Sequence, residues 1–525
     1  MKNERSPIRD AGSMMMPLLY AFIAACASLS LLKNNFFLGT DACLYAISGR
    51  NLVDLGSYPL TYASPFYPLL IAGAYGVTGQ LQWSAHLISV ISFAFSVFLF
   101  FRLVGDHYRK RTAHMATVLY VSHGLVLGYS YRGLTHAVDL LLFIGYLHLS
   151  FALLKDKLLR LPRIAILGAV LAAAVLNRPE HMVTAILLVP ALIRLADAQR
   201  RKKILMLVVL LGVMGTLLYP YAHFLKETTG RWGLTLKTAN LRNIEEVDSS
   251  GQAGGRRYVD RGFYDFDLGR YVWGHKKQLF RKYVNGLGRA CVQLSEILYF
   301  GLGLILAGWG WLVPRRSARS GPQDIILFLC LAPLLFVIPF SDLQPRYYIT
   351  YLPIFFLWIA RGIESVADRF AEGHPHPQTG RIRIYALILG FLLLANIAYT
   401  ISHHTLTIQA VPIEHVEMGT WMKREIPDVK NALMVSVKPF VAFYADSHYT
   451  SPPAVQDHAD LIRWMRSESV DYLIADARDG ISSQPPFKVL RNERHDHPGL
   501  KPVHVIYKSR KIILYQLRPL KSISF

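Results

Sequence analysis

The feature that most limits the fold of this chain is its series of long apolar segments. They recur from the N-terminus to about residue 401, and about 20 apolar residues cross a bilayer as a helix. The 525 residues are 52% hydrophobic with a mean hydropathy of +0.28, which is more apolar than most soluble domains. The sequence therefore predicts a polytopic α-helical membrane protein with about eleven transmembrane helices.

The predicted spans cover residues 15–32, 83–104, 113–131, 134–154, 164–176, 181–195, 204–223, 297–313, 325–340, 347–360 and 384–401. Basic groups such as Arg109–Arg111 and Arg200–Lys203 lie in the short segments between them. Cytoplasmic loops carry such an excess of Lys and Arg. We therefore expect a cytoplasmic N-terminus that enters the membrane as an uncleaved anchor.

The net charge of +22 does not indicate a nucleic-acid-binding protein. Such proteins combine a basic groove with aromatic residues that stack on bases, and here the basic residues are divided among short loops. No nucleic-acid partner is expected, and membrane lipids are the expected surroundings.

Two outer loops are predicted, at residues 33–82 and 224–296. In the first, Thr40 could cap a short amphipathic helix that starts at Asp41 and has Leu44 and Ile47 on its apolar face. Residues 66–77 are apolar but too short to cross the membrane comfortably. In the second loop, the pattern at residues 279–294 suits a helix on the membrane surface.

From about residue 402 the sequence changes character. Residues 416–426 and 461–465 suggest helices, and residues 432–437, 472–475, 503–507 and 512–517 suggest strands. We therefore divide the chain into a transmembrane domain at 1–401 and an extracytoplasmic α/β domain at 402–525.

Asp41 is the first candidate for chemistry. The dipole and free N–H groups of the first helical turn favour its ionised form, and an ionised carboxylate at a membrane surface can act as a general base. The alternative is a helix-terminal charge with no chemical role.

Asp139 lies inside the outer end of the fourth predicted span, near Arg132. Ionisable residues within spans are costly, and they are usually functional or paired. A functional role for Asp139 and an ion pair with Arg132 are both open.

A second group of polar residues occupies the outer ends of other predicted spans. Arg178 and Glu180 lie at the tip of the hairpin between the fifth and sixth spans, and Arg346 and Tyr347 lie at the start of the tenth. Guanidinium groups bind phosphate in a bidentate manner, although single arginines in such places often extend to ordinary lipid head groups. No Cys or His spacing predicts a metal site.

Several segments resemble those of a known family. They are Leu38–Ala46, Arg50–Leu52, Tyr62–Leu70, Asn177–Glu180, Tyr221–Gly233, Pro345–Tyr348, Met418–Tyr444 and Val470–Ile474. Their order resembles the bacterial GT-C superfamily of glycosyltransferases, within the group of dolichyl-phosphate-mannose protein mannosyltransferases and aminoarabinose transferases.

This resemblance implies a GT-C-like fold and a site on the outer face of a bacterial inner membrane. It implies Asp41 as catalytic base. Because polyprenyl phosphate would leave as an anion, Arg346, Arg178 and Arg132 are the candidates to bind it. Asp139, Glu180 and Tyr347 complete the expected substrate-binding residues. Relatives often have a second acidic residue after the first, where this chain has Ala42, so a metal-assisted site is not expected.

The resemblance also implies the reaction. A sugar would move, with inversion, from a polyprenyl-phosphate donor to an envelope acceptor, which could be a glycolipid, a glycan or a protein. No cofactor is expected. The alternative is a transporter or flippase of lipid-linked sugars, which would favour ionisable groups near the bilayer midplane.

Overall fold

The computed structural model describes residues 7–34, 36–58, 64–155, 160–235, 268–313, 321–341, 344–372, 377–409, 413–452, 455, 457–476, 490, 499–508 and 511–518. The chain forms two compact units. The first, the helical unit, comprises Met1–Phe36, Ser64–Thr235 and Gly274–Gln409. The second, the sheet unit, comprises Phe37–Ala63, Leu236–Trp273 and Ala410–Phe525.

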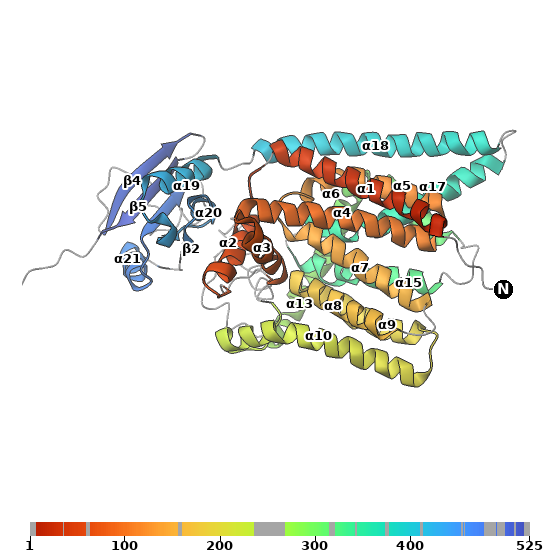
Figure 1. Cartoon of the computed structure of the whole chain (residues 1–525), viewed down its shortest axis with the longest axis horizontal. Helices are drawn as coiled ribbons and strands as arrows, with labels where there is room; N and C mark the ends of the chain where they lie inside the picture. Colours follow the sequence, from red (N-terminus) through yellow and green to blue (C-terminus); the bar gives the residue numbers. More distant parts are fainter. Residues whose placement is uncertain are drawn as a thin grey trace, which may run out of the picture. The chain divides into compact units, whose positions relative to one another are not determined.

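The helical unit consists of helices throughout its described residues (Figure 1). They are α1 (Pro7–Asn34), α3 (Phe66–Thr78), α4 (Leu81–His107), α5 (Lys110–Ser122), α6 (Gly124–Tyr129), α7 (Thr135–Lys155), α8 (Leu161–Asn177), α9 (His181–Leu195), α10 (Arg200–Thr229), α13 (Lys276–Ile297), α14 (Leu302–Leu312), α15 (Gly321–Cys330), α16 (Ala332–Phe336), α17 (Leu352–Glu372) and α18 (Pro377–Gln409), with 3₁₀ helices η4 (Ile338–Phe340) and η5 (Pro345–Tyr351). The short α12 (Leu268–Gly274) ends where the two units meet in the sequence.

The prediction of a polytopic helical membrane protein is confirmed. Among the described residues, seven helical segments are long and apolar enough to cross a membrane, and the bent pair α13–α14 would make eight. The fifth and sixth predicted spans correspond to α8 and α9, which are apolar but shorter. The third corresponds to α5 and α6, which are separated at His123, where the backbone is extended. Every predicted span therefore contains helix, but not every one is a full-length continuous span.

The long helices pack side by side (Figure 1). α4 lies against α1 and α7, and α8 lies against α7 and α10. α14 packs closely against α17, where a Cβ atom added to Gly310 would overlap the carbonyl oxygen of Trp358. A Cβ added to Gly362 would overlap the carbonyl oxygen of Leu306. Small residues of this kind let helix backbones approach closely within membranes.

The sheet unit contains a five-stranded mixed sheet in the order β2-β1-β3-β5-β4. The strands are β1 (Leu433–Val435), β2 (His448–Thr450), β3 (Tyr472–Asp476), β4 (Leu500–Tyr507) and β5 (Lys511–Leu517). β1 is parallel to β2 and β3, whereas β5 is antiparallel to β3 and β4. The predicted strand pair at residues 503–507 and 512–517 is therefore an antiparallel hairpin.

Helices cover both faces of this sheet. Successive side chains of a strand point to opposite faces, and each face packs against its own set of helices. Leu473 and Ala475 pack with α21 (His458–Ser467), and Tyr472 and Ile474 pack with α19 (Ile413–Glu425) and α20 (Phe440–Ala445). A short η6 (Val429–Asn431) precedes β1. The predicted helices and strands of the C-terminal domain are present, but α20 and β2 were not predicted.

The compact units divide the chain differently from the predicted domains. α18 continues to Gln409, beyond the expected boundary at residue 401. Residues 37–63 of the first outer loop belong to the same unit as residues 410–525. They contain α2 (Thr40–Asp54), in which Leu44 and Ile47 are buried as expected. The prediction of Thr40 as the helix cap is wrong, because Gly39 holds that position without a side-chain hydrogen bond.

Candidate functional site

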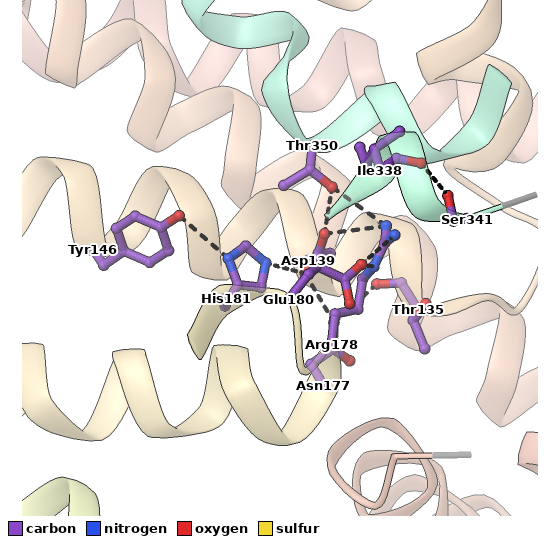
Figure 2. Close-up of polar contacts among 10 residues, drawn as sticks. All are labelled: Thr135, Asp139, Tyr146, Asn177, Arg178, Glu180, His181, Ile338, Ser341 and Thr350. Atoms are coloured by element: carbon purple, nitrogen blue, oxygen red, sulfur yellow. Dashed lines mark hydrogen bonds and ion pairs between the residues drawn. The ribbon is translucent and has the colours of Figure 1, made fainter. Parts of the chain in front are cut away.

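The densest group of buried polar side chains in the helical unit joins three segments (Figure 2). Asp139 lies on α7, Asn177, Arg178, Glu180 and His181 lie at the α8–α9 connection, and Thr350 lies on η5. Asp139 and His181 have no exposed surface, and Arg178 is 6% exposed. We call these six residues the Asp139 cluster.

Asp139 accepts from four donors. Its Oδ1 atom lies 2.8 Å from Nε2 of His181 and 3.3 Å from Nδ2 of Asn177. Its Oδ2 atom accepts from the hydroxyl of Thr350 and lies 3.5 Å from Nη1 of Arg178. A carboxylate offers about four acceptor sites, so the protein itself occupies the acceptor capacity of Asp139. This residue is built to hold neighbours in place rather than to take a proton from a substrate.

His181, the first residue of α9, extends the network to a second residue of α7. Its Nδ1 atom lies 3.4 Å from the hydroxyl of Tyr146 (Figure 2). In the neutral tautomer that carries its hydrogen on Nε2, His181 donates to Asp139 and its Nδ1 atom accepts from Tyr146.

Arg178 is held by two carboxylates. Its Nε and Nη2 atoms lie 2.6 and 2.5 Å from Oε1 of Glu180. Its Nη1 atom lies 3.5 Å from both Asp139 and Thr350. Burial opposes the charge of Arg178, but Glu180 and Asp139 outweigh that effect and raise its pKa. All three guanidinium nitrogens thus contact protein oxygens.

The sequence explains why Arg178 leaves the helix at this point. A residue before proline is disfavoured in the helical region, and Pro179 follows Arg178. The backbone of Arg178 is accordingly extended, with φ −146° and ψ 113°, and α8 ends at Asn177.

The helix type of η5 places Tyr347 and Thr350 together. Side chains three positions apart in a 3₁₀ helix lie above one another. Thr350 contacts Asp139, and the ring centre of Tyr347 lies 5.6 Å from the guanidinium of Arg178. The guanidinium of Arg346 lies at the same distance from that ring. Two arginines from different segments therefore lie beside one tyrosine ring.

Arg132 is associated with this group less directly. Its guanidinium lies 4.5 Å from the ring centre of Tyr129, and that ring lies 4.9 Å from His136, one turn before Asp139. An ion pair between Asp139 and Arg132 was one of the two interpretations that the sequence left open, whereas the structure pairs Asp139 with Arg178 and His181.

Asp41 belongs to the sheet unit. It is half-buried in the first turn of α2, as expected. The structure thus brings together Asp139, Arg178, Glu180, Tyr347 and Arg346 within the helical unit and places Asp41 in the other.

Sequence reasoning missed Asn177, His181 and Thr350. The signal was present in Asp139 itself, because a carboxylate inside a span needs several donors to offset its burial. Those donors had to come from the ends of neighbouring helices.

Within the ranges that the structure describes, no three His, Cys, Asp or Glu side chains form a group that could hold a metal ion. Metal independence stays a prediction. All four cysteines are free thiols.

The chain is similar to several known proteins. Residues 62–221 match the family model described as dolichyl-phosphate-mannose-protein mannosyltransferase, and this stretch contains Asp139, Arg178 and Glu180. Among solved structures, the oligosaccharyltransferase of Archaeoglobus fulgidus tethered to an acceptor peptide matches with a TM-score of 0.59 and 16% identity. The match covers 88% of this chain and 69% of the other.

ArnT from Cupriavidus metallidurans, bound to undecaprenyl phosphate, matches with a TM-score of 0.55 and 12% identity over 94% of this chain and 97% of the other. This chain has the GT-C glycosyltransferase fold. The GT-C oligosaccharyltransferase AglB of A. fulgidus, in complex with an inhibitory peptide and a dolichol-phosphate, matches with a TM-score of 0.54 and 14% identity over 88% of this chain and 69% of the other. The comparison with curated proteins found no match.

Proposed function

We propose that this protein is an integral membrane glycosyltransferase that moves a sugar from a polyprenyl-phosphate donor to an envelope acceptor. The acceptor classes are glycolipid, glycan and protein, and the reaction inverts the sugar carbon on the outer face of a bacterial inner membrane. The observation that carries the proposal is the GT-C fold, shared along 94% of this chain with a protein solved with undecaprenyl phosphate.

The arginines beside Tyr347 suit the leaving group of this reaction. Polyprenyl phosphate departs as an anion, so it needs positive charge rather than a proton. The guanidinium nitrogens of Arg178 contact Glu180, Asp139 and Thr350, so the protein itself already engages the donors and the charge of Arg178. We assign the direct phosphate contact to Arg346, with Tyr347 beside it.

Asp41 is the proposed general base. It would take the proton of the acceptor hydroxyl while that oxygen attacks the anomeric carbon and the bond to the lipid phosphate breaks. Direct attack of this kind inverts the carbon. Asp41 suits the role because it is a partly accessible carboxylate in the first turn of a helix.

The first test is a comparison of envelope glycans and glycolipids by mass spectrometry in cells with and without the gene. The loss of one sugar from a defined acceptor is expected. Identical profiles under conditions in which the protein is present in the membrane would overturn the proposed function.

The second test uses purified variants with the donor identified in this way. Asp41→Asn should lower the transfer rate by about 10²–10⁴-fold, the usual contribution of a general base. Asp54→Asn, an exposed carboxylate on the same helix, is the matched control and should transfer normally. Arg346→Gln should weaken undecaprenyl phosphate binding, whereas Arg289→Gln on the exposed part of α13 should not. Normal transfer by Asp41→Asn would remove Asp41 from the mechanism.

A further inference from the structure

The helix that carries Asp41 is attached to the C-terminal part of the chain within the sheet unit. Arg50, near the end of α2, places Nη1 at 2.8 Å from Oδ1 of Asp446 and Nη2 at 2.5 Å from the carbonyl oxygen of Ser447. Leu38, two residues before α2, donates its backbone N–H to the hydroxyl of Tyr444 at 3.2 Å. The end of α20 therefore contacts the chain just before α2 and again near the end of α2.

The backbone at the end of α20 places Asp446 and Ser447 where both can contact Arg50. The helix ends with Asp446 in the left-handed region at φ 62° and ψ 33°, which Asp tolerates better than most residues. The N–H of Ser447 then returns to the carbonyl oxygen of Ala442 at 2.9 Å. This turn presents a carboxylate and a neighbouring carbonyl oxygen to one guanidinium, and only Arg can contact both through its planar fork.

Burial distinguishes Arg50 from the other cations around Asp446. Lys423 and Lys430 approach the Asp446 carboxylate at 3.5 and 3.9 Å, but their side chains are 54% and 71% exposed. Exposed ion pairs of this kind contribute little. Arg50 is 4% exposed, so removing its partner would leave a buried charge.

We propose that Arg50, Asp446 and Tyr444 are positioning residues that hold α2 in place, so that the C-terminal domain is part of the catalytic apparatus rather than an appended binding module. The role in catalysis rests on the proposed function, in which Asp41 on α2 is the base. An isolated helix of 15 residues is marginal in water, so α2 depends on such contacts for a fixed geometry.

The attachment is tested first without any assay of activity. Hydrogen–deuterium exchange is followed at the amides of α2 in the full-length protein in detergent micelles. Arg50→Gln and Asp446→Asn should each speed this exchange by about ten-fold or more, as expected when a local unit opens more readily. Asn keeps the left-handed backbone of Asp446 available. Lys430→Gln, which alters an exposed neighbour of the same carboxylate, should leave the exchange unchanged.

The catalytic role is tested by separating transfer from lipid binding. Arg50→Gln and Asp446→Asn should lower the transfer rate by about ten-fold or more and leave the Kd for undecaprenyl phosphate unchanged. Arg50→Lys keeps the charge but makes one contact and should give an intermediate rate. Tyr444→Phe removes one acceptor with little change of shape and should show a smaller loss, which keeps the test valid if a charge variant fails to fold.

The outcomes separate the two proposals. Unchanged exchange at α2 in both Arg50→Gln and Asp446→Asn would overturn the attachment, whatever the activity. Faster exchange with normal transfer would overturn its catalytic role. Faster exchange together with no transfer by the wild-type protein would confirm the attachment and contradict the proposed function.

Discussion

At the scale of single residues, Asp139 shows how a charge is accommodated in the helical unit. Its two oxygens accept from four side chains, three at the α8–α9 connection and one on η5. Because protein donors occupy every acceptor site of Asp139, its role is structural. Removing this carboxylate should lower the stability of the protein more than it changes the reaction.

Asp139→Asn should lower the free energy of unfolding by about 3 kcal/mol, because it breaks a buried ion pair while Glu180 still balances part of the charge of Arg178. The measurement is thermal unfolding in detergent, followed by tryptophan fluorescence. Asp106→Asn is the control, since its pair with Arg102 at 3.8 Å is largely exposed and should contribute less than about 1 kcal/mol. Equal unfolding temperatures for Asp139→Asn and wild type would contradict this account.

Individual residues also mark the limit of sequence reasoning. The cost of burying Asp139 predicts that partners exist, but it does not say which. Arg132 is nearer in the sequence, yet the extended backbone before Pro179 supplies Arg178 from another helix pair. Which arginine pairs with Asp139 depends on which helix ends meet in space, and a single sequence does not contain this information.

At the scale of elements, hydrophobic patterning predicted most helices and strands, because each has a long or regular apolar face. α20 was missed because six residues are too few for a periodic signal. β2 is as short as β1, but its sequence His-Tyr-Thr lacks the apolar run that marks β1. Short helices that lie beside longer ones, such as α8 and α9, resemble full spans in composition and differ only in length.

The contact between α14 and α17 gives a prediction for an element pair. Gly310→Ala should destabilise the protein by about 1–3 kcal/mol, because the new methyl group overlaps the carbonyl oxygen of Trp358 and the helices must separate. Gly308→Ala, on the same helix, has no atom within 4 Å of the added Cβ and should be neutral or slightly stabilising. Thermal unfolding of the two variants in one detergent gives the comparison, and equal losses would argue against close packing at Gly310.

At the scale of the whole molecule, the orientation in the membrane stays a prediction that rests on the distribution of Lys and Arg. It places α13 on the outer side, where Cys291 is an exposed free thiol. A membrane-impermeant maleimide should therefore label Cys291 in intact spheroplasts. Cys291→Ser should remove the label, because the reagent cannot reach the other three cysteines. Cys43 and Cys330 are buried, and Cys26 lies within the first predicted span. Labelling only after the membrane is opened would reverse the predicted topology.

The pairing of Arg50 with Asp446 also has a consequence for biosynthesis. The two residues are 396 positions apart, and at typical translation rates the ribosome needs about 20–80 s to pass from one to the other. During this interval α2 has emerged without the partners that fix it, since α20 and all five strands are still to be made. A chain that stops before α20 would thus leave α2 without Tyr444, Asp446 and Ser447, and synthesis through this turn becomes the condition for a fixed Asp41.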